Sequence, residues 1–106
     1  MKLFEIIWSY HAENELDLIF RDYSEVAGSL VAKKIVREIV SEPNKLCGNP
    51  KLGQCEEWLL HRPIEYRYLV CRQFKLIYSI DFNMKWIKIA DVFDTRQNPE
   101  KMKRSQ

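Results

Sequence analysis

Residues 64–93 constrain the fold more than any other part of the sequence, because they predict three consecutive β-strands. The side chains of residues 66–71 fall into two alternating sets, with Tyr66, Tyr68 and Val70 on one face and Arg67, Leu69 and Cys71 on the other. Residues 74–80 alternate in the same way. This period of two is expected of strands that have two different faces. A β-branched and aromatic run at residues 86–93 follows a polar turn and predicts the third strand. Such a meander has an apolar face that other elements must cover.

Two amphipathic segments upstream are the candidates for that cover. Residues 9–23 place their apolar side chains on one helical stripe, and Ser9 is positioned to cap the first turn with its hydroxyl. Residues 24–41 form a second stripe and predict a second helix. Ser24 would cap this helix, Pro43 would end it, and Gly28 lies within it. A short apolar run at residues 2–8 predicts a further strand before the helices.

The expected fold is therefore α+β: an N-terminal strand and a helical hairpin, followed by an antiparallel sheet of three to four strands packed on the hairpin. Residues 55–60 are a candidate for the short edge strand. At 106 residues the chain has the length of a single domain, 1–106, of which residues 94–106 are expected to form a polar tail with a frayed end. The predicted core consists of Leu16, Phe20, Val31, Ile35, Ile39, Leu76, Tyr78 and Ile89.

Charge is distributed unevenly along the chain. Residues 1–61 carry a net charge of −3, and residues 62–106 carry +5. A basic sheet half fits an acidic or polyanionic partner, but charge alone favours the simpler interpretation that it keeps a small surface solvated.

The cysteine pattern and the hydropathy indicate a cytoplasmic protein. The three cysteines, Cys47, Cys55 and Cys71, are odd in number and lack the spacing of a metal site, so free thiols in a reducing compartment are expected. No apolar run reaches the roughly 20 residues that span a bilayer, and the N-terminus lacks the cleavage site of a secretion signal.

Three short segments resemble a known family. They are YRYLV at residues 66–70, LIY at residues 76–78 and VFDTRQNP at residues 92–99. With the strand, the hairpin and the Pro/Gly loop at residues 43–54 before them, they resemble the RelE/ParE family of bacterial type II toxin–antitoxin systems, also called plasmid stabilisation or addiction modules. The resemblance covers roughly residues 2–99. It implies a small cytoplasmic toxin without cofactor, metal or membrane partner, which an antitoxin neutralises by wrapping a disordered, acidic-amphipathic segment around it.

Members of this family carry out two different activities. RelE-like toxins enter the ribosomal A site and cleave mRNA without a metal, whereas ParE-like toxins are not nucleases and poison DNA gyrase. The fold alone does not choose between them. The ending at residues 94–99 looks more like the ParE branch.

For a nuclease, the expected catalytic cations around the scissile phosphate are Arg67, Lys75 and Arg96. Strand alternation predicts that Arg67 and Lys75 project together from the sheet face away from the helices. Arg72 and Lys88 are further cations, and they are better explained as exposed strand residues that keep an open sheet soluble.

A general base is harder to assign, since no His or Tyr follows Tyr78 in the sequence. Tyr78 and Asp94 are the weaker catalytic candidates, together with His61 and Glu65. Tyr78 lies in an otherwise apolar series and is better explained as a core aromatic with a satisfied hydroxyl. His11 lies in the first turn of a predicted helix and has no catalytic companion in the sequence.

Three hypotheses follow. The first, slightly favoured because the C-terminal base is absent, is a non-catalytic toxin of DNA gyrase or another protein. The second is a ribosome-dependent mRNA endoribonuclease. The third is a degenerate family member that binds an antitoxin without being toxic.

Overall fold

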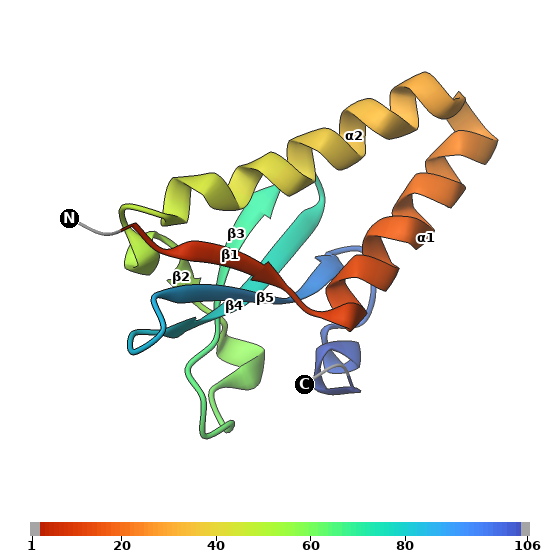
Figure 1. Cartoon of the computed structure of the whole chain (residues 1–106). Helices are drawn as coiled ribbons and strands as arrows, with labels where there is room; N and C mark the ends of the chain where they lie inside the picture. The colour runs from red at the N-terminus through yellow and green to blue at the C-terminus, as the bar shows by residue number, and fades with distance from the viewer. Residues whose placement is uncertain (1–2, 105–106) are drawn as a thin grey trace.

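A computed structural model describes residues 3–104 and shows a strand, a helical hairpin and a five-stranded sheet (Figure 1). The α+β class is confirmed. The strands are β1 (Glu5–Trp8), β2 (Gln54–Cys55), β3 (Arg67–Cys71), β4 (Phe74–Asp81) and β5 (Trp86–Asp94). The α-helices are α1 (Tyr10–Ala27) and α2 (Ser29–Ser41), and the 3-10 helices are η1 (Glu42–Leu46), η2 (Pro50–Leu52), η3 (Glu57–Leu59) and η4 (Pro99–Arg104). Lys2, which was predicted to begin the first strand, lies outside the described residues. No helix within residues 3–104 has the length and apolarity to cross a membrane.

The strand order is β1-β5-β4-β3-β2, so the predicted meander forms the centre of the sheet. Its three strands pair antiparallel as expected. However, β1 runs parallel to β5, with Glu5 opposite Trp86 and Trp8 opposite Ile89, so the prediction of an entirely antiparallel sheet is wrong at this edge. Tight turns force neighbouring strands to be antiparallel, whereas the long hairpin that follows β1 leaves its direction to tertiary packing.

The hairpin turns at Gly28, and the predicted boundary before Ser24 is wrong. Gly28 has φ +91°, a backbone conformation that residues with a side chain rarely adopt. Its N–H donates to the Ser24 carbonyl at 3.0 Å and closes the last turn of α1. Ser9 does cap α1 as predicted, since its Oγ accepts the Ala12 N–H at 3.1 Å.

The segment between the hairpin and the meander is more helical than predicted. Helix α2 ends before Pro43, as expected, but the chain continues as η1 with Pro43 in its first turn, where the missing N–H costs little. Of the edge strand predicted at residues 55–60, only Cys55 pairs with β3, and the chain then turns into η3. The Glu56 carboxylate starts this turn by accepting the Trp58 N–H at 3.3 Å.

The larger core lies between the hairpin and the sheet. Five of the eight predicted core residues are buried to 2% exposure or less: Ile35, Ile39, Leu76, Tyr78 and Ile89. Leu16 is partly buried and packs against this core, whereas Phe20 and Val31 were predicted wrongly, because Phe20 is only partly buried outside the core cluster and Val31 is 43% exposed. The hairpin projects beyond the sheet (Figure 1), so apolar side chains near its tip have no strand to pack against.

The opposite face of the sheet is covered in part by the C-terminal segment. A second buried cluster joins η3, β4, β5 and η4 through Leu59, Ile77, Phe93 and Met102. Arg62 Nη2 also donates to the Lys103 carbonyl at 2.6 Å. Residues 99–104 of the predicted polar tail thus form a 3-10 helix that one apolar side chain, Met102, docks on the sheet, and the last residues, 105–106, lie outside the described residues.

Candidate functional site

The cations predicted for a nuclease site lie apart in the structure. Arg67 is directly opposite Tyr78 in the sheet, whereas the Lys75 Nζ lies 4.3 Å from the centre of the Tyr68 ring. Directly opposed residues share a sheet face, so Arg67 lies on the hairpin side and Lys75 on the other side. The prediction of a shared face is wrong, because the β3–β4 register couples odd-numbered residues of β3 to even-numbered residues of β4.

Arg67 fastens the Pro/Gly loop to the edge of the sheet. Its Nη1 donates to the Gly53 carbonyl at 2.8 Å and to the Lys51 carbonyl at 3.3 Å. Its Nε donates to Glu65 Oε1 at 2.7 Å. These contacts give Arg67 and Glu65 a structural role as a brace for the loop.

Tyr78 is a buried core aromatic with a satisfied hydroxyl, as predicted. The hydroxyl donates to the Pro50 carbonyl at 2.7 Å and accepts the Gly53 N–H at 3.0 Å. A Cβ at position 53 would lie 2.6 Å from that hydroxyl, so only glycine fits this close approach. Burial raises the pKa of Tyr78, which keeps the hydroxyl protonated and unsuited to act as a base.

Lys75 forms a partly buried ion pair. Its Nζ lies 2.9 Å from Oε2 of Glu56, whose side chain is fully buried. This contact compensates the charge of the buried Glu56 carboxylate. The charge of Lys75 is correspondingly engaged within the chain.

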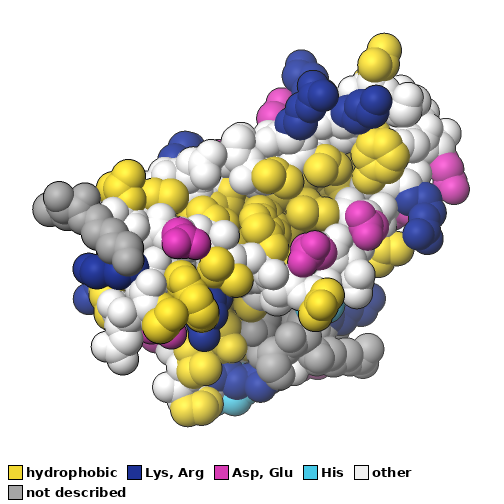
Figure 2. Space-filling view, in the orientation of Figure 1, with side chains coloured by type: hydrophobic (Ala, Val, Ile, Leu, Met, Phe, Trp, Pro, Cys, Tyr) yellow, Lys and Arg dark blue, Asp and Glu magenta, His cyan; other side chains and the backbone are white. Residues whose placement is uncertain are grey.

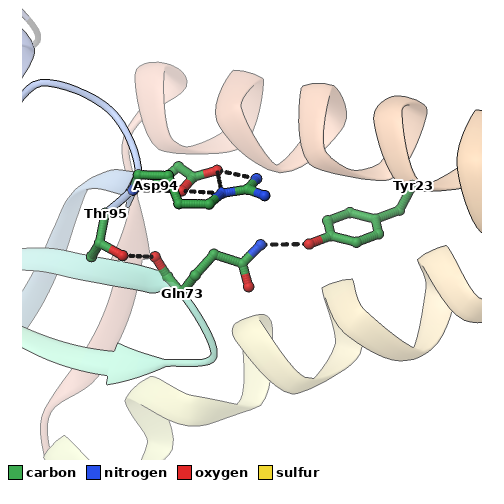
Figure 3. A network of polar contacts seen from close by, with 5 residues as sticks. Tyr23, Gln73, Asp94 and Thr95 are labelled. Carbon is green, nitrogen blue, oxygen red and sulfur yellow. Dashed lines mark hydrogen bonds and ion pairs between the residues drawn. The ribbon is translucent and has the colours of Figure 1, made fainter.

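Asp94 and Arg96 form an ion pair at the end of β5, beside a polar network that joins three elements (Figure 3). Arg96 Nη2 lies 2.6 Å from Asp94 Oδ2, and Arg96 Nε lies 3.0 Å from Asp94 Oδ1. In the network, Gln73 donates to the Tyr23 hydroxyl on α1, and the Thr95 hydroxyl donates to the Gln73 carbonyl at 2.7 Å. The guanidinium holds the pKa of Asp94 below its usual range, which makes Asp94 a weak base.

The remaining candidates lie at the surface. His61 and Lys88 are exposed. Arg72 lies in the β3–β4 turn and donates to both carboxylate oxygens of Glu38 on α2, at 2.7 and 3.2 Å. The interpretation of Lys88 and Arg72 as surface residues therefore fits their positions, although Arg72 is a turn residue with φ 56°.

His11, Glu15 and Asp91 form a cluster that the sequence analysis did not find. His11 Nε2 lies 3.0 Å from Asp91 Oδ1 and 3.8 Å from Glu15 Oε1, and Asp91 is only 3% exposed. The cluster lines a cavity of about 260 Å³ together with Asp94 and Lys101, among others. His11 and Asp91 are 80 residues apart in the sequence and form no motif, so no local signal could have paired them.

We expect Glu15→Gln to stabilise the protein at neutral pH. Burial, and then the charge of Asp91, raise the pKa of Glu15, and the attraction to His11 opposes them less strongly. An acid whose pKa is raised by folding destabilises the fold once it ionises, above its unfolded pKa of about 4.3. The variant should therefore gain up to ~1 kcal/mol at pH 7, and the gain should vanish below about pH 4.

Thermal unfolding between about pH 3 and pH 8 would measure this difference. Glu13→Gln, on an exposed side chain of the same helix, is the matched control and should show no such gain. A lower unfolding temperature for Glu15→Gln than for the unaltered protein at pH 7 would contradict the assignment.

An apolar surface lies between the hairpin and β1. Partly buried side chains of β1 (Ile6 and Trp8), α1 (Leu16) and α2 (Val36) pack against the main core, and we call these four residues the apolar strip. Figure 2 shows apolar side chains gathered between α2, α1 and β1 on this side of the molecule. Within residues 3–104, β1 has a neighbouring strand on one side only. An apolar surface beside a free strand edge can receive a partner both as a helix and as an added strand.

Comparisons with known proteins identify the family and the fold. The family model described as the ParE toxin of the type II toxin–antitoxin system parDE matches residues 6–99. Among solved structures, the chain is similar to the chromosomal ParDE toxin–antitoxin system from P. aeruginosa, with a TM-score of 0.71 and 22% sequence identity. That match covers 86% of this chain and 95% of the other, and at this identity it shows the fold. No curated protein sequence matches the chain.

Proposed function

Because the chain belongs to the ParE toxin family of type II toxin–antitoxin systems, we propose that it stops bacterial growth by binding DNA gyrase, without catalysing a reaction itself. Family membership makes the protein the toxin of such a module and implies a cognate antitoxin. The proposal places the toxin in the bacterial cytoplasm, where gyrase acts.

A non-catalytic toxin is supported by where the three predicted cations lie and by the partners that each of them has. Metal-independent RNA cleavage needs cations that converge on one phosphate, next to a base for the 2′-hydroxyl. Instead, Arg67 bonds to loop carbonyls, Lys75 to the buried Glu56, and Arg96 to Asp94. These cations lie at separate places, with Arg67 and Lys75 on opposite faces of the sheet, so they do not converge on one phosphate, which favours a protein-binding toxin over phosphate chemistry.

One observation favours the alternative, a ribosome-dependent endoribonuclease. His11, whose ring is oriented by the buried Asp91, would supply the general base that the C-terminal part lacks, and Lys101 lines the same cavity. Against this, Glu15 and Asp94 also line the cavity, and their negative charges would repel a phosphate. A gyrase supercoiling assay and an mRNA cleavage assay on the same purified protein test the two proposals side by side.

We further propose that the antitoxin occupies the apolar strip. A disordered, amphipathic segment would fold on binding, with a helix over Trp8, Leu16 and Val36 and an extended part along the free edge of β1. Such a partner gains most of its affinity from apolar burial, and charge chiefly changes its association rate.

We expect antitoxin association to slow as salt rises. The net charge of +5 on residues 62–106 would attract an acidic segment over long range, and salt screens that attraction. Between 50 mM and 300 mM NaCl the association rate constant, measured by stopped-flow fluorescence, should fall ~10-fold while the dissociation rate changes little. A rate that is indifferent to salt would mean that this charge serves solubility alone.

A further inference from the structure

The two helices that border the apolar strip carry opposite charges. Helix α1 has five acidic residues and one basic residue: Glu13, Glu15, Asp17, Asp22 and Glu25 against Arg21. Helix α2 has the reverse balance: Lys33, Lys34 and Arg37 against Glu38. Figure 2 shows Lys and Arg side chains over α2, Asp and Glu side chains over α1, and the apolar surface between them. We infer that the segment received by the strip must be acidic along the flank that meets α2 and basic along the flank that meets α1.

On α1, two acidic residues stand at the border of the strip. Leu16 belongs to the strip, Glu13 precedes it by three positions, and Asp17 follows Glu13 by four. Residues three or four positions apart are neighbours on a helix surface, so the two carboxylates form one acidic rim beside Leu16. Both side chains are exposed.

On α2, two basic residues stand at the same spacing. Val36 belongs to the strip, Lys33 precedes it by three positions, and Arg37 follows Lys33 by four. Helices α1 and α2 border the apolar surface from different sides (Figure 2), so the acidic rim beside Leu16 and the basic rim beside Val36 stand on the two sides of the strip. Lys33 and Arg37 are exposed, and in the described part of the chain neither rim forms an ion pair.

Unpaired charges at the rim of an interface contribute specificity more than affinity. An amphipathic helix that keeps its apolar face on the strip has two possible directions, and turning it end for end exchanges its flanks. Consider a partner helix with one acidic flank and one basic flank. In one direction its acidic flank meets the basic rim of α2 and its basic flank meets the acidic rim of α1, whereas in the other direction each flank meets a rim of its own charge. The rims therefore select the direction of the partner helix, and with it the end that continues along β1.

This inference rests on the proposed antitoxin site, and charge reversal of each rim tests it. The protein is prepared as the unaltered chain, as Lys33→Glu/Arg37→Glu and as Glu13→Lys/Asp17→Lys. Affinity is measured by calorimetry in 50 mM NaCl, with the antitoxin encoded by the neighbouring gene. Each double reversal should weaken binding about 10-fold, because rim attraction becomes repulsion.

The controls separate rim charge from net charge and from folding. Lys88→Glu changes an exposed residue of β5 and should leave the affinity within about 2-fold of the unaltered protein. Circular dichroism confirms that each variant is folded. If Glu13→Lys/Asp17→Lys binds more tightly, the partner is acidic on both flanks and the inference is wrong. Unchanged affinity in both double variants also overturns it. If the unaltered protein does not bind the antitoxin, the proposed antitoxin site itself fails.

Discussion

Expression of this protein without its antitoxin should arrest bacterial growth, and the purified protein should leave gyrase trapped on cleaved DNA. Co-expression of the antitoxin should restore growth. The reason is membership of the ParE toxin family, together with the separation of the candidate catalytic cations, which do not converge on one site. Gyrase-dependent linearisation of supercoiled plasmid is the direct measurement, and mRNA incubated with ribosomes should remain intact.

Arg96 offers a more specific test of this function. Its side chain is 71% exposed, so it can reach a partner, and arginine is a common hot spot of protein interfaces. Arg96→Ala should therefore reduce gyrase poisoning ~10-fold to 100-fold while leaving the fold intact. Lys88→Ala is the control, because Lys88 is an exposed cation near the other end of β5.

Two outcomes would contradict the proposal. Cleavage of ribosome-bound mRNA at codon-defined positions, lost ~100-fold in both Arg67→Ala and Arg96→Ala, would identify a nuclease. Soluble protein that accumulates without slowing growth would identify an antitoxin-binding protein that is no longer toxic.

Leu76→Asp should prevent the protein from folding. Leu76 lies in β4 with no exposed surface, between the sheet and the hairpin. The substitution removes its apolar contacts, at a cost of ~3–5 kcal/mol, and adds a buried carboxylate without a partner. Together these effects approach the total stability of ~5–15 kcal/mol that is typical of a domain. Circular dichroism and the soluble yield after expression measure the loss.

Val70→Asp is the control for this prediction. Val70 lies on the neighbouring strand β3 and is 57% exposed, opposite Lys75. The same chemical change should therefore cost less than about 1 kcal/mol there. A folded Leu76→Asp protein with a normal unfolding temperature would show that the assignment of Leu76 to the main core is wrong.

Local patterns in the sequence predicted the elements of the fold well. Alternation along β3 and β4 and the β-branched run in β5 identified the meander, and Ser9 identified the start of α1. These features depend on residues within a few positions of one another, which one stretch of sequence contains in full. The family resemblance rested on the same stretches, and the family comparison confirmed it.

The candidate site was predicted less well, because its geometry depends on register. Whether Arg67 and Lys75 share a face is decided by which residue of β3 lies opposite which residue of β4, and a shift of one position reverses the answer. The network of Tyr23, Gln73 and Thr95 likewise needs α1, the β3–β4 turn and the end of β5 to meet.

The sequence by itself determined the two long helices, the strands β1, β3, β4 and β5, and the resemblance to the family. Only the tertiary structure decided that β1 runs parallel to β5, that Met102 docks the C-terminal segment, and that His11 meets Asp91. It also brought the acidic rim of α1 and the basic rim of α2 to the two sides of one apolar strip. Periodicity is a property of neighbouring residues, whereas these contacts join residues far apart in the chain, and they form only when the whole core packs.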